Sequence, residues 1–357
     1  MNAKQRYRLH GGRVQRWGAL LAGLLLAMAL ASAVPPAAAA GAPAGPRIAW
    51  SQFTDRQFSG AHLVTAEADG RNAAQLTFPD EGIVDLDPVW SPDHTQIAFE
   101  RDSAERADVF VINADGSNEH MLDVGCVSPC EAVLEPSWSA DGTRLLFTLV
   151  YSPFDQVNES ATSAVLWSAN LDGSDLQRVS EPGIDGVYED YHARYSPDGS
   201  YLIFVRVSNA QDQVAQFRMD SNGTNIRQLT PWDLNADTAD LSQATSGPTK
   251  DLVVFESYGH GEAPPGSVED VRTVPTTCLS VEQCTPLIRN LTNNGAGPKH
   301  SNNPTWSPDG SHIAFVEYTA PATAHGFEYA DIFTMTANGT DQHRVSRSPT
   351  WNFRPDW

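Results

Sequence analysis

Six polar side chains precede a recurring Pro-x-Trp motif, and they are the residues of this chain best suited to bind a ligand or a partner. Aligning the copies of the motif gives Asp87, Glu135, His192, Gln243, Asn303 and Arg354. Carboxylate, amide, imidazole and guanidinium groups in one ring could bind a cation, a sugar or a peptide segment of a partner. A solvated channel mouth must also be polar, so a purely structural explanation stays open.

Metal-binding and catalytic motifs are less well supported. Asp85, Asp190 and Asn352 lie two residues earlier in their repeats and could add to the ring, but His192 is its only histidine. The fragments Asp85-x-Asp87 and Asp220-Ser221-Asn222-Gly223 resemble parts of calcium loops without the distal Glu, and the second fits a turn better. We therefore predict no metal site and no cofactor, with a divalent cation such as calcium as the alternative.

Linear enzyme signatures are missing from the sequence. It contains no Gly-x-Ser-x-Gly, no His-Glu-x-x-His and no Gly-x-x-x-x-Gly-Lys motif. We assign no catalytic residue. The sequence does not decide whether the chain is an enzyme, because repeat proteins can assemble sites from distant segments, but the missing motifs favour a non-enzyme.

A repeat of roughly 50 residues must position these side chains. Its hydrophobic strand recurs as 48–50, 97–99, 145–147, 202–204, 253–255 and 313–315. Ahead of most copies stands a Pro-x-Trp-Ser-Pro-Asp-Gly-like hairpin turn, with a worn copy at 246–248. Later Asp-Gly or Asn-Gly turns and a short closing strand complete each unit. Four strands in each of six units predict an all-β, six-bladed β-propeller with antiparallel blades.

The two ends of the repeat region complement each other. The strand at 48–50 lacks a preceding Pro-x-Trp, whereas the chain stops at Arg354-Pro355-Asp356-Trp357. We expect residues 355–357 to pair with residues 48–51 in one composite blade, which closes the ring. An open solenoid or two sandwiches is the alternative.

The N-terminus has the composition of a targeting segment. Residues 1–40 carry a basic start, an apolar run at 18–34 and Ala-rich cleavage sites. We predict a signal peptide at 1–40, a linker at 41–46 and the propeller at 47–357. An uncleaved anchor is the alternative; after cleavage we expect no membrane span.

The four cysteines fit an exported protein. Cys126 and Cys130, then Cys278 and Cys284, form two close pairs in turn-rich segments, which predicts two local disulfides. The formal net charge is −21, and loss of the five basic leader residues leaves 18 Lys+Arg against 44 Asp+Glu, or −26. This acidity argues against nucleic acid and anionic membranes as partners.

The repeat resembles that of the TolB family. The shared pattern is Pro-x-Trp-Ser-Pro-Asp-Gly-x-x-Ile-Ala-Phe, followed by Asp-Ile-Phe-x-Met-x-Ala-Asn-Gly and a closing Leu-Thr, and it covers residues 47 onward. The resemblance implies a propeller and, for TolB proteins, binding of a peptidoglycan-associated lipoprotein in the periplasm. Similar propellers precede peptidase domains or occur in oligogalacturonate lyases. We expect no TolB N-terminal domain here, which puts a role in the Tol system in doubt.

Two functional hypotheses follow. The first is a periplasmic or secreted, monomeric, non-catalytic propeller that binds an envelope or extracellular protein through the channel mouth and a face of long loops. Those loops are expected at 151–164, 181–191, 232–241, 258–267 and 318–330. The second is a polysaccharide lyase or hydrolase that uses the mouth carboxylates, with Trp232, Tyr258 and Phe327 as sugar platforms.

Overall fold

The computed structural model describes residues 46–55, 58–151, 163–181, 187–258, 269–295, 297–319 and 330–357. The predicted signal peptide and all of the predicted linker except Pro46 lie outside these residues. In the described part, nearly every regular element is a β-strand, as predicted. No helix there is long and apolar enough to cross a membrane.

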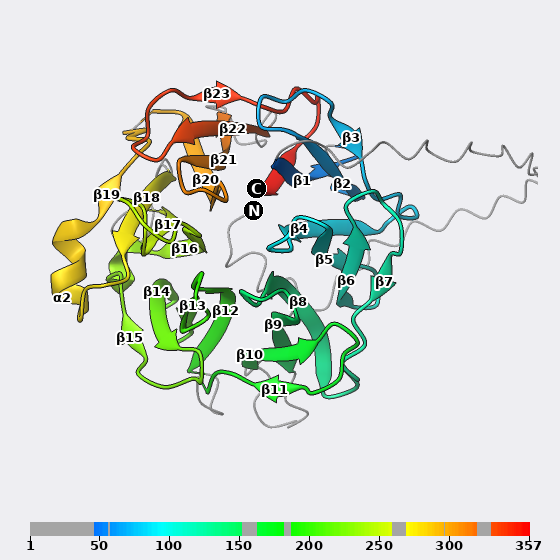
Figure 1. Cartoon of the computed structure of the whole chain (residues 1–357), viewed down its shortest axis with the longest axis horizontal. Helices are drawn as coiled ribbons and strands as arrows, with labels where there is room; N and C mark the ends of the chain where they lie inside the picture. Colours follow the sequence, from blue (N-terminus) through cyan, green and yellow to red (C-terminus); the bar gives the residue numbers. More distant parts are fainter. Residues whose placement is uncertain are drawn as a thin grey trace, which may run out of the picture.

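The strands form antiparallel sheets arranged around a common axis (Figure 1). Four sheets have four strands each; they are β8 (Cys130–Trp138), β9 (Arg144–Tyr151), β10 (Ser163–Asn170) and β11 (Gln177–Arg178); β12 (Tyr188–Tyr195), β13 (Tyr201–Ser208), β14 (Gln213–Asp220) and β15 (Arg227–Gln228); β16 (Ala236–Leu241), β17 (Leu252–Ser257), β18 (Asp270–Pro275) and β19 (Arg289–Asn290); and β20 (Lys299–Trp306), β21 (His312–Thr319), β22 (Ala330–Thr336) and β23 (His343–Arg344). Such radial sheets define a β-propeller.

The fifth sheet contains both ends of the described chain. Its strands are β24 (Asn352–Asp356), β1 (Arg47–Phe53), β2 (Ala61–Glu67), β3 (Ala74–Gln75), β4 (Val84–Trp90), β5 (Gln96–Asp102), β6 (Ala107–Asn113) and β7 (His120–Met121). One parallel bridge, Ala61↔Val84, joins four antiparallel strands on one side to four on the other. The last strand pairs with the first through Ala49↔Asp356 and Ser51↔Phe353.

The second strand of each set supplies the core between sheets. Its central aromatic side chain is fully buried in five copies, namely Phe99, Phe147, Phe204, Phe255 and Phe315. Burying a Phe side chain stabilises a fold by roughly 1.5–3 kcal/mol. The repeat therefore recurs because each copy packs the same residue between neighbouring sheets.

The predicted Ser-Pro-Asp turns are confirmed. In the first copy, the Ser91 hydroxyl donates to Asp93 Oδ1 at 2.7 Å and accepts the Gln96 N–H at 3.0 Å. The Asp93 carboxylate also accepts the Thr95 N–H at 3.0 Å. Because these bonds pair the polar groups of the turn, each turn fixes the register of the first two strands of its sheet.

Glycines of the outer Asp-Gly turns bring neighbouring sheets into close contact. A Cβ atom on Gly173 would lie 1.9 Å from the carbonyl oxygen of Asp123, two residues after the last strand of the preceding sheet. A Cβ atom on Gly70 would lie 2.3 Å from the Val345 carbonyl oxygen, so the first sheet contacts the last in the same way. Both glycines also have φ near +80°, a conformation that favours glycine.

The prediction of a long loop at residues 232–241 is wrong. Residues 232–241 instead form the short helix η1 (Trp232–Leu234) and the innermost strand β16. The following turn has ten residues, 242–251, where the first copy has five, 91–95. Alignment of Pro248 with the proline of the other turns assumes a turn of ordinary length, so the predicted innermost strand lay five positions too late. The loop predicted at 181–191 is also partly wrong, because residues 188–191 begin the innermost strand β12. The other three predicted long loops, 151–164, 258–267 and 318–330, lie largely outside the described residues.

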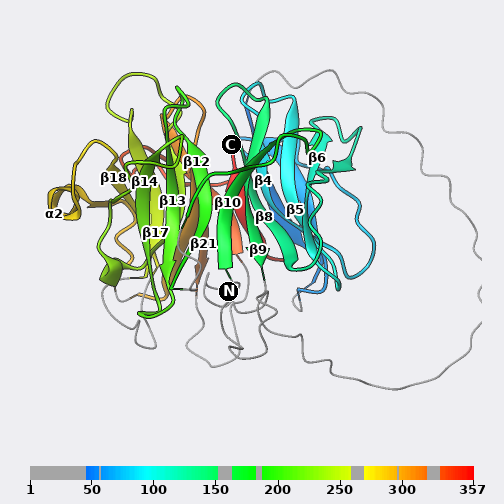
Figure 2. The same cartoon turned by 90° about the horizontal axis from the view of Figure 1, so that it is seen from below.

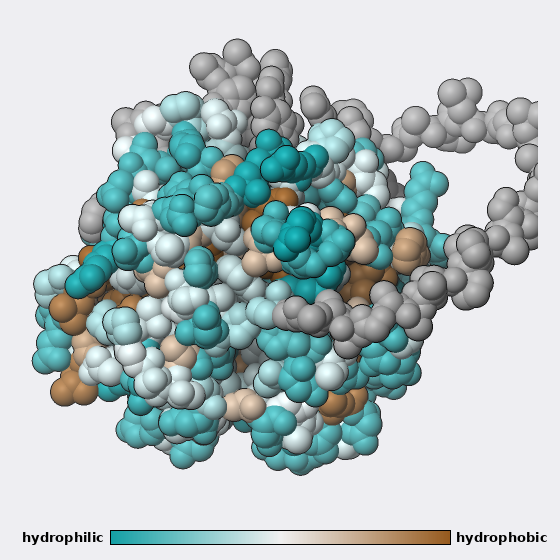
Figure 3. Space-filling model, turned by 45° about the horizontal axis from the view of Figure 1, so that its top comes forward, coloured by the Kyte–Doolittle hydropathy of each residue, from teal (hydrophilic) through white to brown (hydrophobic). Residues whose placement is uncertain are grey.

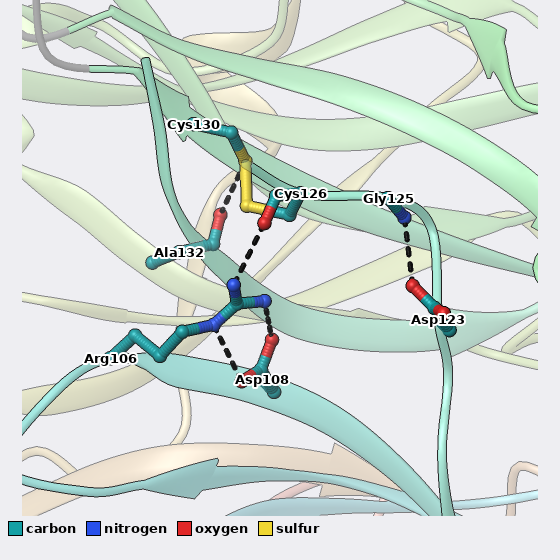
Figure 4. Close-up of a disulfide and its surroundings, with 7 residues drawn as sticks. All are labelled: Arg106, Asp108, Asp123, Gly125, Cys126, Cys130 and Ala132. Atoms are coloured by element: carbon teal, nitrogen blue, oxygen red, sulfur yellow. Dashed lines mark hydrogen bonds and ion pairs between the residues drawn. A yellow bond between two sulfur atoms is a disulfide. The ribbon is translucent and has the colours of Figure 1, made fainter. Parts of the chain in front are cut away.

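Both predicted disulfides are present, and they fit an exported protein. Figure 4 shows Cys126–Cys130, where the Arg106 guanidinium donates to the Cys126 carbonyl at 2.8 Å and pairs with Asp108. The Cys278–Cys284 bridge closes a loop that contains the small helix α2 (Val281–Cys284), and the short helix η2 (Thr285–Leu287) follows it. This excursion stands where other copies have an Asp-Gly turn.

The face drawn in Figure 3 is mostly hydrophilic, with separate small apolar patches. The most exposed large apolar side chains among the described residues are Phe78, Val127 and Leu279. They come from three different connections, so the described surface offers no single apolar strip along one element.

Candidate functional site

Each innermost strand carries a bulge at the channel, where its register with the second strand shifts. Five predicted site residues occupy these bulges with left-handed backbones, namely Asp87, Glu135, His192, Asn303 and Arg354, whose φ angles lie between 46° and 55°. This conformation costs a non-glycine residue on the order of 1–3 kcal/mol. The surrounding sheets must therefore hold these side chains in place.

The five bulge residues line one central cavity, together with Thr238. Gln243 does not line it: its side chain lies exposed in the turn after β16 and donates to the Leu241 carbonyl at 3.0 Å. Thr238 occupies the equivalent bulge, so the prediction of Gln243 at the mouth is wrong. The cavity has a volume of ≈ 30 Å³, which is room for a water molecule or two. A sugar ring does not fit inside it.

Carboxylates of neighbouring sheets accept the N–H groups that the bulges turn away from the strand ladder. Glu100 Oε2 accepts the N–H of Glu135 at 3.0 Å, and Glu135 Oε2 accepts that of His192 at 3.0 Å. Glu256 Oε2 likewise accepts the N–H of Asn303 at 2.6 Å. Since these bonds are buried and charge-assisted, they stabilise the seams between sheets strongly.

A second polar layer lies beside the bulges, and no sequence-based prediction included it. Its members are the middle residues of the Pro-x-Trp motif, and Arg194, Asp240, Thr305 and Asp356 line the cavity. Asp240 Oδ2 accepts the Trp306 N–H at 2.7 Å, and Asp356 Oδ2 accepts the Trp90 N–H at 2.8 Å. Burial, and then the nearby Asp240, raise the pKa of Asp356 to about 7. The signal in the sequence that could have found this layer was the variable middle position of the Pro-x-Trp motif.

Four side chains form a polar chain across the channel. Arg354 Nε lies 3.2 Å from Asp87 Oδ1, and Arg354 Nη1 lies 3.0 Å from His192 Nε2. The same His192 Nε2 lies 2.9 Å from Glu135 Oε1. Because β12 and the C-terminal strand stand on opposite sides of the ring (Figure 1), the Arg354–His192 contact crosses the channel.

A buried carboxyl pair lies beside this chain. Asp237 and Glu256 are directly opposite on β16 and β17 and are 1% and 2% exposed. Tyr258 donates its hydroxyl to Glu256 Oε1 at 2.7 Å, and the Thr238 N–H donates to Asp237 Oδ1 at 2.8 Å. Burial, and then the charge of Glu256, raise the pKa of Asp237 to about 7. Asp237 therefore holds its proton to a higher pH than an ordinary aspartate does.

The remaining predicted residues have structural roles. Asp85 and Asp190 form two-bonded ion pairs with Arg101 and Arg206 on the neighbouring strands. Asn352 Oδ1 accepts the Trp50 indole N–H at 2.9 Å. None of these three lines the cavity. As predicted, residues 220–223 form the turn between third and fourth strands, where the Gly223 N–H donates to the Asp220 carbonyl.

Two of the three proposed sugar platforms contact other side chains of the protein, and the third lies outside the described residues. Trp232 packs against Tyr188 and Phe217, with ring centroids 6.2 and 5.5 Å apart. Tyr258 donates to Glu256, and Phe327 lies outside the described residues. Within the described ranges, no group of three or more His, Cys, Asp or Glu side chains is placed to hold a metal ion.

Comparison with solved structures shows a TolB-like propeller, which Figure 2 presents from the side. TolB from Acinetobacter baumannii superposes with a TM-score of 0.61 and 19% identity over 87% of this chain, which spans 66% of that protein. A putative TolB from Agrobacterium tumefaciens gives 0.56 and 16%, over 84% of this chain and 88% of that one.

A chain of a nidogen/laminin complex gives a TM-score of 0.55 and 11% identity, over 87% of this chain and 97% of that one. No family model and no curated protein sequence matches the chain. At these identities the likeness shows the fold alone.

Proposed function

We propose that this chain is an exported, closed six-bladed propeller that binds a protein partner in the envelope or extracellular space and catalyses no reaction. In this proposal β24 and β1 belong to one composite blade, and the partner binds at the channel mouth. The two TolB structures and the nidogen/laminin complex share the fold, and the two disulfides fit export. The acidic composition favours a partner surface with basic groups.

The observation that carries the proposal is the set of five strained, non-glycine bulges around one mouth. Backbone strain concentrates at functional sites, because it persists only where the structure holds a side chain in a required place. The small cavity volume indicates that a partner would contact the mouth from outside rather than thread through the channel.

The alternative, a polysaccharide lyase or hydrolase, has less support. Both Glu135 oxygens contact His192, through its N–H and its imidazole, and Asp87 lies beside the Arg354 guanidinium. Carboxylates that hold structural contacts are poorly placed to exchange protons with a substrate. We therefore treat turnover as an outcome of the test below.

Crosslinking and affinity capture from a native envelope test the proposal. A mouth variant, Asp87→Asn with Glu135→Gln and His192→Gln, keeps the side-chain sizes and removes two negative charges. A control variant, Asp115→Asn with Asp172→Asn, removes two negative charges at exposed turns between the third and fourth strands of their sheets, outside the cavity lining. We expect the wild type and the control to capture the same protein and the mouth variant to lose it.

Equal capture by both variants, or no captured protein, would overturn the proposal. So would turnover of any polysaccharide in a panel with and without calcium or manganese, if the mouth variant abolished it. Both variants are first compared with the wild type by thermal unfolding, so that misfolding is not mistaken for a binding defect.

A further inference from the structure

The imidazole of His192 stands between two partners that compete for one nitrogen atom. His192 Nε2 lies 2.9 Å from Glu135 Oε1 and 3.0 Å from Arg354 Nη1. A ring nitrogen that carries a proton can donate to the carboxylate but cannot accept from the guanidinium. A ring nitrogen without a proton can accept from the guanidinium but cannot donate to the carboxylate. Only one of the two contacts is favourable in each state.

Each of the two contacts has a different consequence for the channel. Glu135 lies on β8 of the neighbouring sheet, so its contact with His192 does not cross the channel. Arg354 lies on the opposite side of the ring, so its contact with His192 crosses the channel. Arg354 also has Asp87 beside it at 3.2 Å, which can retain the guanidinium when the cross-channel contact is lost.

We propose that the Arg354–His192 contact is a proton-operated latch across the central channel. The latch is closed when His192 is neutral with its proton on Nδ1, because Nε2 then accepts from Arg354. It opens when His192 becomes an imidazolium, because Nε2–H then pairs with Glu135 and the two cations repel. The latch belongs to the chain alone and does not depend on the proposed partner.

Charged groups on four strands surround the Arg354–His192 contact. His192 faces Glu135 on β8 and Arg354 on β24, and Asp87 on β4 lies beyond Arg354. On β16, Asp237 is affected by the charges of both Arg354 and Glu135. His192 is 3% exposed, so its interactions are screened little by solvent.

Side-chain nitrogen NMR on the wild-type protein tests the latch. At pH 8 we expect His192 to be neutral with its proton on Nδ1. Between pH 8 and pH 5.5 we expect the side-chain N–H groups of Arg354 to exchange with water about tenfold faster after correction for chemical rates, since a buried charge-assisted hydrogen bond is lost. The signals are assigned by their loss in Arg354→Lys and His192→Gln.

The variant His192→Gln separates the latch from general effects of pH. A glutamine can still accept from Arg354 but cannot be protonated, so we expect slow Arg354 exchange at both pH values. The matched control His343→Gln changes an exposed histidine on the outer strand β23 and should keep the wild-type pH response. A His192 proton on Nε2 at pH 8, an Arg354 exchange rate that ignores pH, or the same response in His192→Gln would overturn the latch.

Discussion

Asp237 is a carboxyl group whose buried position disfavours its charged form, unlike the exposed aspartates of the turns. Its carboxyl is 1% exposed and faces Glu256 across two strands. Two ionised carboxylates so placed repel each other in a medium that screens them poorly. The pKa of Asp237 is therefore raised to about 7, chiefly because of burial. In contrast, hydrogen bonds from Ser200 lower the pKa of the exposed turn residue Asp198 to about 2.

The first prediction concerns the pH dependence of stability. Because the folded-state pKa of Asp237 is raised, its proton is bound more tightly in the folded than in the unfolded chain. Its contribution to stability is present below about pH 4 and is lost as the pH rises to about 7. We expect the free energy of unfolding to fall between pH 5 and pH 8, and Asp237→Asn to remove on the order of 2 kcal/mol of that fall.

Urea unfolding at the two pH values measures this effect. The control Asp115→Asn alters an exposed turn residue and should leave the fall unchanged. An Asp237→Asn protein with the full wild-type fall would contradict the assignment. The latch proposed above opens as the pH falls, whereas the Asp237 contribution to the free energy of unfolding grows as the pH falls. Side-chain exchange at Arg354 reports the first effect and urea unfolding reports the second.

At the scale of the elements, the outer Asp-Gly turns are the contacts most sensitive to a single atom. Gly173 approaches the backbone of the preceding sheet so closely that a methyl group has no room. Gly82 has a similar φ, +84° against +79°, yet a Cβ atom added there would meet nothing within 4 Å. The pair therefore separates backbone strain from steric overlap.

The second prediction is that Gly173→Ala destabilises the fold far more than Gly82→Ala. Gly82→Ala should cost on the order of 1 kcal/mol, because alanine is strained at positive φ. Gly173→Ala should cost about 2 kcal/mol more, since the sheets must also separate. Chemical denaturation measures both. Equal losses would show that the close contact between sheets does not limit stability.

The Cys278–Cys284 excursion replaces such a turn in the sheet β16–β19. Arg218 and Arg227 of the preceding sheet donate to the Thr276 carbonyl at 3.0 and 2.9 Å. These bonds join the two sheets where the other copies use a glycine contact. Both cysteines are also buried in a cluster that contains Leu234 and Phe255.

The third prediction is that replacing both cysteines by serine weakens this seam. On the chain-entropy view a loop this short contributes about 2 kcal/mol, and serine hydroxyls in the apolar cluster add to the loss. Thermal unfolding of Cys278→Ser/Cys284→Ser measures the effect. The equivalent change at Cys126 and Cys130 should cost less, because Cys130 is only partly buried; the opposite order would refute this account of the excursion.

At the scale of the whole molecule, the repeat could be predicted because each sheet buries the same aromatic residue and uses the same turn. The pairing of β24 with β1 was predictable from complementary ends. The site was less accessible. Five bulge residues directly precede a recognisable motif. Thr238 could not be located from the sequence, because the turn after its strand is longer than in the first copy and its extra residues follow no pattern. The cross-channel contact of Arg354 with His192 joins residues 162 positions apart, which no local motif encodes.

Native-state hydrogen exchange of the C-terminal strand tests the closed ring most directly. In β24, Asp356, Phe353 and Asn352 pair with residues of β1. If this pairing closes the ring, the amides of these three residues that bond to β1 will exchange only through global unfolding, at the same free energy as those of β5. If they exchange much faster than those of β5 under native conditions, the C-terminal strand is not part of a closed ring.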